Sequence, residues 1–133
     1  MDQNNKKYSI TIIGLGNIGL LYDLNKNWDS KEFLTHTRSA FFHKNFDLKY
    51  LIDSDTKKLD LAKENYGNEI IYLTNINHEY YPTDIIVLSS TPEVNTIYLN
   101  KLKSNSKVKL FLIEKPFLNH DEKISNYKNI LKK

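Results

Sequence analysis

The stretch that most constrains the fold of this chain is residues 8–19. An apolar, β-branched run at 10–13 ends on three glycines with the spacing G-x-G-x-x-G. The first glycine permits a tight turn from a strand into a helix, the second removes a side chain that would block a pyrophosphate, and the third lets the helix pack close to the strand. Free N–H groups at the helix start then bind phosphates. The pattern predicts a dinucleotide site with contacts from Gly14, Gly16, Asn17, Ile18 and Gly19.

A glycine-rich turn that binds no ligand is the alternative. The position of the glycines directly after a strand-like run, near the N-terminus where a first strand belongs, argues against this alternative.

Composition narrows the class of protein further. The 133 residues suffice for one domain with a real core, and 40% hydrophobic with 26% charged residues is typical of a globular protein. The net charge of +3 comes from scattered lysines, which gives a nucleic-acid partner little support. Without cysteine or a long apolar run, and with four dispersed histidines, we expect a cytoplasmic protein with no membrane span and no metal site.

Strand-like and helix-like segments alternate along the chain. Such alternation is typical of a doubly wound α/β domain with a parallel sheet and right-handed crossovers, and we expect five strands in the order 3-2-1-4-5. Strands are expected at 10–13, 48–52, 70–72, 85–88 and 108–113, and helices at 17–24, 59–66, 94–102 and 121–131. A further helical piece is expected around residues 40–42, capped by Thr35 or Thr37.

Ligands of such sheets bind at the carboxyl ends of the strands, and Asp53 ends the second strand. Its carboxylate is suited to accept both hydroxyls of an adenosine ribose and to repel a 2′-phosphate, which favours NAD over NADP, although Lys57 and Lys58 leave NADP open. Asp53 follows Gly19 by 34 positions instead of the usual 20 or so, and an insertion at 25–35 explains the excess. Within this segment, a packing role is favoured for Trp28 over a contact with the cofactor.

The ends of the fourth and fifth strands complete the expected site. Small hydroxylic residues at 89–91 let a cofactor approach the backbone, with helix capping by Ser90 or Thr91 as the alternative. Pro116 fixes the preceding Lys115 in an extended conformation, where its ammonium is able to polarise a substrate hydroxyl, although spacing alone favours a surface role. The further expected cofactor contacts are Asp53, Ser54, Ser90, Thr91, Pro92, Glu114 and Lys115.

Five segments, taken in order, resemble the N-terminal half of the glucose-fructose oxidoreductase and inositol dehydrogenase family (Gfo/Idh/MocA). They are Gly-Leu-Gly-Asn-Ile-Gly at 14–19, Thr-His at 35–36 with Ala40, Ile-Asp-Ser-Asp at 52–55, Ser-Thr-Pro at 90–92 and Glu-Lys-Pro at 114–116. The resemblance implies a Rossmann domain that binds NAD or NADP and takes part in hydride transfer with sugars, cyclitols or related small alcohols. It also implies that Lys115 lies near the nicotinamide as a candidate catalytic residue and that the bond before Pro116 is cis.

Two departures from the family shape the expectations for this chain. Thr96 stands where relatives commonly have a histidine, and relatives continue beyond the equivalent of Lys133 into a sixth strand and a second domain that supplies most of the substrate pocket. We therefore expect residues 1–133 to form a single NAD(P)-binding domain that is inactive alone. A non-catalytic cofactor sensor, a subunit completed by a partner chain and a truncated product are the alternatives. The apolar edge strand at 108–113 invites pairing with a second copy or a partner.

Overall fold

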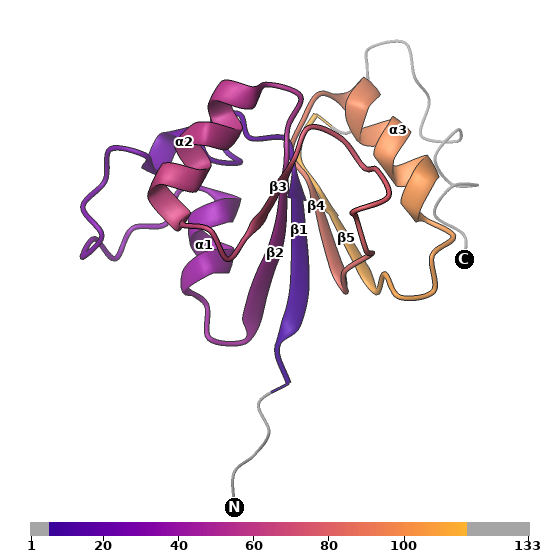
Figure 1. Ribbon diagram of the computed structural model, residues 1–133, viewed down its shortest axis with the longest axis horizontal. Helices are drawn as coiled ribbons and strands as arrows, with labels where there is room; N and C mark the ends of the chain where they lie inside the picture. The colour runs from indigo at the N-terminus through magenta and orange to yellow at the C-terminus, as the bar shows by residue number, and fades with distance from the viewer. Residues whose placement is uncertain (1–5, 117–133) are drawn as a thin grey trace, which may run out of the picture.

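The structure is a computed structural model that describes residues 6–116, and it contains a five-stranded parallel sheet in the predicted order β3-β2-β1-β4-β5 (Figure 1). The strands are β1 (Tyr8–Ile13), β2 (Phe46–Ile52), β3 (Ile71–Leu73), β4 (Ile85–Leu88) and β5 (Leu110–Ile113). The helices are α1 (His36–Phe42), α2 (Thr56–Tyr66) and α3 (Pro92–Leu102), with a 3₁₀ helix, η1, at Leu21–Asp23. The helix expected at 121–131 lies outside the described residues.

Both faces of the sheet are covered, which is why its central strands are apolar on both sides. In Figure 1, α1 and α2 lie on one face and α3 on the other. The side chain of Ile12 packs in the core cluster with α1 and α2, and that of Ile13 packs in the cluster with α3. Within residues 6–116, no helix combines the length and hydrophobicity that a membrane span requires.

The register of the parallel pairs brings three strand ends together. Ile13, the last residue of β1, lies opposite Ile52 of β2 and Leu88 of β4. The loops that follow these strands therefore start side by side at one edge of the sheet, and this is where the predicted site residues are found.

The helix predicted at 17–24 was wrong. A turn begins at Gly16, whose carbonyl accepts from the N–H of Leu20, and the chain then enters η1 and leaves the helical path. The carbonyl of Ile18 accepts from the N–H of His36 at 3.0 Å, fourteen positions beyond its partner in an unbroken helix. The first helix is thus interrupted by residues 22–35, which we call the excursion, and it resumes in register as α1. The predicted insertion at 25–35 lies within this excursion.

A buried carboxylate, that of Asp23, explains why the chain leaves the helical path. The side chain of Asp23 is 3% exposed, and its Oδ2 accepts from the N–H of Leu34 and from both the N–H and the hydroxyl of Thr35, at 2.7–2.9 Å. Hydrogen bonds to a charged acceptor are stronger than neutral ones, so these three bonds outweigh the local helical preference of residues 20–24. Thr35 in turn caps α1, as predicted, by accepting from a backbone N–H of its first turn.

A buried guanidinium holds the outer part of the excursion. Arg38 is 2% exposed, and its Nη2 donates to the carbonyls of Asn27, Trp28 and Ser30 at 2.9–3.3 Å. The ring of Trp28 packs edge-on against three aromatic rings, those of Phe41, Phe42 and Tyr66. The predicted packing role of Trp28 is therefore confirmed.

Asp84 connects the starts of β1, β4 and β5, at the opposite end of the strands from the glycine turn. Its carboxylate accepts from the N–H and hydroxyl of Ser9 and from Nζ of Lys109, at 2.7–2.9 Å. The Lys109 ammonium, followed by the donors of Ser9, holds the pKa of Asp84 well below its usual value. A carboxylate with a lowered pKa stabilises the folded state above its unfolded pKa, near 3.9, and this stabilisation is lost as pH falls toward the folded pKa.

We therefore expect Asp84→Asn to lower the free energy of unfolding at pH 7 and the deficit to shrink as pH falls below about 4. Denaturant unfolding at pH 7, 5 and 3 measures this. Asp47→Asn is the control, because Asp47 pairs with Lys49 on the surface with its side chain 41% exposed. An equal deficit for Asp84→Asn at pH 7 and pH 3 would contradict the role of the charge.

Candidate functional site

The glycine turn after β1 is built by close backbone contacts. Gly14 has φ of +96°, and a Cβ there would lie 2.7 Å from the backbone of Ser89 and Ser90. A Cβ on Gly19 would overlap the carbonyl oxygen of Gly14. The hydroxyl of Ser89 donates to that same carbonyl at 2.7 Å. The fold itself therefore requires the first and third glycines of the motif.

Among the described residues, no contact requires a glycine at position 16, the second glycine of the motif. A Cβ at this position would meet no atom within 4 Å, and its φ lies outside the left-handed region that favours glycine. The N–H groups of residues 16–19 donate to no other group among residues 6–116. Unpaired N–H groups at the start of a helical turn attract an anion, and the missing side chain leaves space for one.

Asp53 connects the end of β2 to the glycine turn. Its Oδ2 accepts from the N–H of Leu15 at 2.7 Å, and its Oδ1 accepts from the N–H of Asp55 at 2.9 Å. Nζ of Lys58 lies 3.6 Å from Oδ2, and the Asp53 side chain is 11% exposed. Each carboxylate oxygen has capacity for a second hydrogen bond. Asp55 caps α2 by accepting from the N–H of Lys57 at 3.0 Å.

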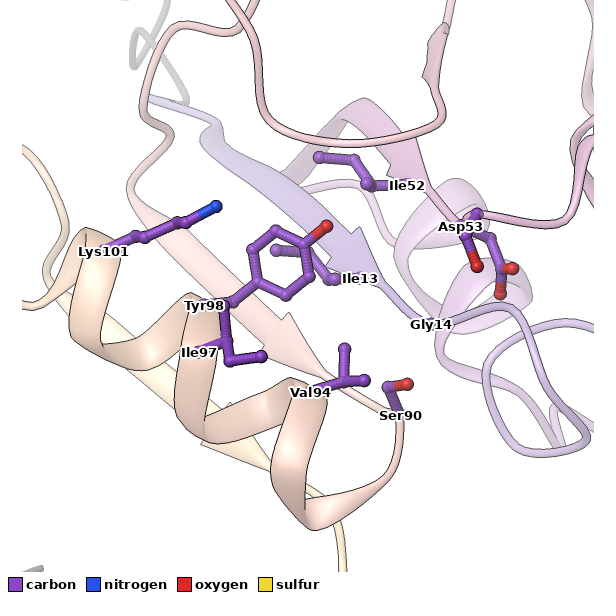
Figure 2. Close-up of a pocket in the computed structure, with 10 residues that line it drawn as sticks. Ile13, Gly14, Ile52, Asp53, Ser90, Val94, Ile97, Tyr98 and Lys101 are labelled. Atoms are coloured by element: carbon purple, nitrogen blue, oxygen red, sulfur yellow. The ribbon is translucent and has the colours of Figure 1, made fainter.

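A pocket of about 260 Å³ lies beside the glycine turn, between the ends of β1 and β2 and the helix α3 (Figure 2). In Figure 2 the ring of Tyr98 projects from α3 into this space, with Lys101 at the far end from Asp53. Burial raises the pKa of Tyr98, and the negative charge of Asp53 adds to the effect. The lining residues are Ile13, Gly14, Ile52, Asp53, Ser54, Ser90, Val94, Ile97, Tyr98 and Lys101.

Four of the predicted contacts meet in this pocket: Gly14, Asp53, Ser54 and Ser90. The lining residues from α3 were not predicted from the sequence. These residues follow one another at intervals of three, one and three positions, which places them on one helix face. From that spacing, the sequence could have predicted that Val94, Ile97, Tyr98 and Lys101 lie on one side of the helix.

The other predicted contacts at the ends of β4 and β5 do not line the pocket: they are Thr91, Pro92, Glu114 and Lys115. Thr91 is the N-cap of α3, but its side chain makes no capping bond; instead Oδ1 of Asn95 accepts from the N–H of Ser90 at 3.0 Å. Pro92 occupies the first turn of α3, and Lys115 is exposed at the end of β5. The bond between Lys115 and Pro116 is cis, as the resemblance implied.

His36 and Glu114 form a pair that the sequence analysis did not anticipate. Nε2 of His36 lies 2.7 Å from Oε1 of Glu114, and the two side chains are 21% and 24% exposed. They are separated by 78 positions in the sequence, so no local pattern indicates the contact. Among residues 6–116, there is no group of three or more acidic or histidine side chains placed to hold a metal ion.

Comparison with known proteins supports the fold. The chain is similar to a solved oxidoreductase from Agrobacterium radiobacter, crystallised with NAD⁺, L-tartaric acid and magnesium, with a TM-score of 0.65 and 17% identity. The match covers 94% of this chain and 31% of that protein, so the chain spans about a third of its length. At this identity the similarity shows a shared Rossmann-type fold. No protein-family model matches the sequence. No curated protein matches it either.

The different roles of two glycines give a direct test. Gly19→Ala should lower the free energy of unfolding by several kcal/mol, on the order of 3 kcal/mol, because its Cβ would overlap the Gly14 carbonyl. Gly16→Ala should change it by less than about 1 kcal/mol, because the new methyl group meets nothing and the backbone conformation suits alanine. Thermal and denaturant unfolding measure both. Equal losses in the two variants would show that Gly16 is structural.

Proposed function

We propose that residues 1–133 form the cofactor-binding domain of an oxidoreductase and that the cofactor is a nicotinamide dinucleotide. The observation that carries the proposal is the open space at Gly16 beside the unpaired N–H groups of residues 16–19. A pyrophosphate offers the acceptors that these N–H groups lack, and a glycine at this position lets it approach the backbone. We propose that the backbone and side chains of Asn17 and Ile18 also contact the cofactor.

The pocket suits the adenosine half of such a ligand. The walls formed by Ile13, Ile52 and Val94 are apolar, and the ring of Tyr98 offers a flat face to a base. Asp53 lies at the edge of the pocket toward the glycine turn, where its carboxylate is placed to accept from ribose hydroxyls.

We propose NAD as the preferred cofactor over NADP. A 2′-phosphate on the adenosine ribose would lie against the carboxylate of Asp53, and the two negative charges would repel each other. Lys58, 3.6 Å from Asp53, offsets part of this repulsion. The preference is therefore expected to be moderate, with NADP binding more weakly.

For the reaction, we propose hydride transfer between the cofactor and a sugar, cyclitol or related small alcohol. When bound, the nicotinamide ring supplies the hydride donor or acceptor. Lys115 would hold or polarise the substrate hydroxyl, with Thr91, Pro92 and Glu114 forming the nearby edge of the site. The ordered segments that resemble Gfo/Idh/MocA proteins support this assignment.

We further propose that β5 contacts a second copy or a partner chain. Within the described part of the chain, β5 pairs with β4 on one side and has no strand on its other side. Leu110 and Leu112 on this strand are 52% and 41% exposed. An apolar strand edge with exposed leucines favours association with another chain.

Calorimetric titration with NADH and NADPH tests the cofactor proposal. The wild-type chain should bind NADH more tightly than NADPH. Asp53→Ala should weaken NADH binding by about tenfold or more, because the acceptor of the ribose hydroxyls is lost. Asp53→Asn should narrow the difference between the two nucleotides, because the repelling charge is gone while one acceptor oxygen stays.

Asp60→Ala is the matched control, since Asp60 lies exposed on α2 away from the pocket and should bind like wild type. A folded wild-type chain that binds neither nucleotide would refute the proposal. Equal losses in Asp53→Ala and Asp60→Ala would refute the assigned site.

A further inference from the structure

Four aromatic side chains on the excursion and on α1 form one exposed cluster, which we call the aromatic patch: Trp28, Phe33, Phe41 and Phe42. The ring centroid of Phe42 lies 5.3 Å from that of Trp28 and 5.7 Å from that of Phe33. The centroids of Trp28 and Phe41 are 6.1 Å apart. Each of the four residues is between 40% and 46% exposed. The rings therefore contact one another while each leaves almost half of its surface in water.

The aromatic patch is held in place from the buried side. The guanidinium carbon of Arg38 lies 5.3–5.7 Å from three ring centroids of the patch, and the same group donates to three carbonyls of the excursion. The buried ring of Tyr66 on α2 lies 5.6 Å from Trp28 and 5.1 Å from Phe41. Side chains that are already ordered lose less conformational entropy when a partner binds. The patch is therefore preorganised for a contact.

The size of the aromatic patch fits the core of a protein–protein interface. A large aromatic side chain has a surface of about 150–250 Å², so the exposed parts of the four rings amount to roughly 300–400 Å². Apolar patches of about this size are the largest found on typical monomeric proteins and are often functional. A stable interface buries about 800 Å² on each partner, a little more than half of it apolar. The patch supplies most of that apolar share.

The charges around the patch favour a second copy of this chain as the partner. Asp29, Lys31 and Glu32 are exposed next to the aromatic residues of the excursion, and the exposed Lys44 follows α1. Lys26 pairs with Glu32 within the chain. A surround of one sign would repel its own copy and require a partner of opposite charge. A surround with both signs lets two copies related by a two-fold axis place opposite charges against each other.

The aromatic patch is separate from the other surfaces discussed above. In Figure 1 the excursion lies beside α1 and α2, on the opposite face of the sheet from α3. The pocket lies between the strand ends and α3, and β5 forms the sheet edge beyond β4. A contact through the patch therefore leaves both the pocket and the free edge of β5 accessible.

We infer that the aromatic patch is the interface of a homodimer, in which two copies of this chain pack their patches against each other about a two-fold axis. Rings from the two copies contact one another edge to face, the arrangement that aromatic pairs prefer. Trp28 is the main anchor, because tryptophan is among the residues that contribute most to interface affinity. The inference goes beyond the proposed function and does not depend on a bound cofactor.

The fluorescence of Trp28 reports on this surface directly, because it is the single tryptophan of the chain. Sedimentation equilibrium from about 1 μM to about 1 mM protein measures self-association, and acrylamide quenching over the same range measures the access of solvent to Trp28. A dimer should form as the concentration rises. Its formation should lower the quenching constant about twofold or more and move the emission to shorter wavelength, because the indole ring loses contact with water.

Phe33→Ser should weaken the dimer at least tenfold, because the variant removes one ring from the centre of an apolar contact. Circular dichroism checks that its fold is retained. Tyr81→Ser is the matched control, since Tyr81 is an exposed aromatic residue outside the patch, and this variant should dimerise like wild type. Leu110→Ser removes an exposed leucine of β5 and should leave the quenching change at Trp28 intact.

A wild-type chain that stays monomeric over the whole range would overturn the inference, as would a dimer in which Trp28 is quenched as readily as in the monomer. A dimer weakened by Leu110→Ser and not by Phe33→Ser would assign self-association to β5 and would also overturn it. The wild-type quenching comparison decides without any variant. Nucleotide titration is independent of these results, so the proposed function and this inference fail separately.

Discussion

The contact on which the rest of the structure depends is the close approach of Gly19 to the carbonyl oxygen of Gly14. A side chain at Gly19 would overlap that oxygen, and one at Gly14 would press on the backbone after β4. These two glycines let the chain reverse tightly after β1 and place the turn against β4. The same reversal leaves the N–H groups of residues 16–19 without an acceptor among residues 6–116. The geometry that closes the fold therefore also leaves free the donors to which we propose that a pyrophosphate binds.

The excursion shows that this edge tolerates a long interruption directly after it. The bond from the His36 N–H to the Ile18 carbonyl carries the helical hydrogen-bond pattern across the gap, so α1 continues the path started at Gly16. The cost of looping out residues 22–35 is offset by the buried Asp23 and Arg38, which satisfy backbone groups of the excursion. The junction also delivers His36 to the end of β5, where a continuous helix would carry a different residue.

Local patterns sufficed for the strands and the glycine turn, because each rests on residues adjacent in sequence. The strand order followed from the alternation of strands and helices along the chain. The position of Asp53 at the end of β2 was predicted despite its unusual distance from Gly19, because an apolar run in the sequence marks the end of β2. The helix at 17–24 was predicted wrongly, since the bonds between Asp23 and Thr35 depend on tertiary structure. The His36–Glu114 pair spans 78 positions, and no periodicity could reveal it.

We expect the unpaired N–H groups of the glycine turn to bind the pyrophosphate of a nicotinamide dinucleotide. Titration of the ¹⁵N-labelled chain with NAD⁺, followed by backbone amide NMR, tests it most directly. The amide resonances of residues 16–19 should move most, together with those of Asp53 and Tyr98 beside the pocket. Unchanged resonances at 16–19 at saturating NAD⁺, or changes confined to another surface, would contradict it.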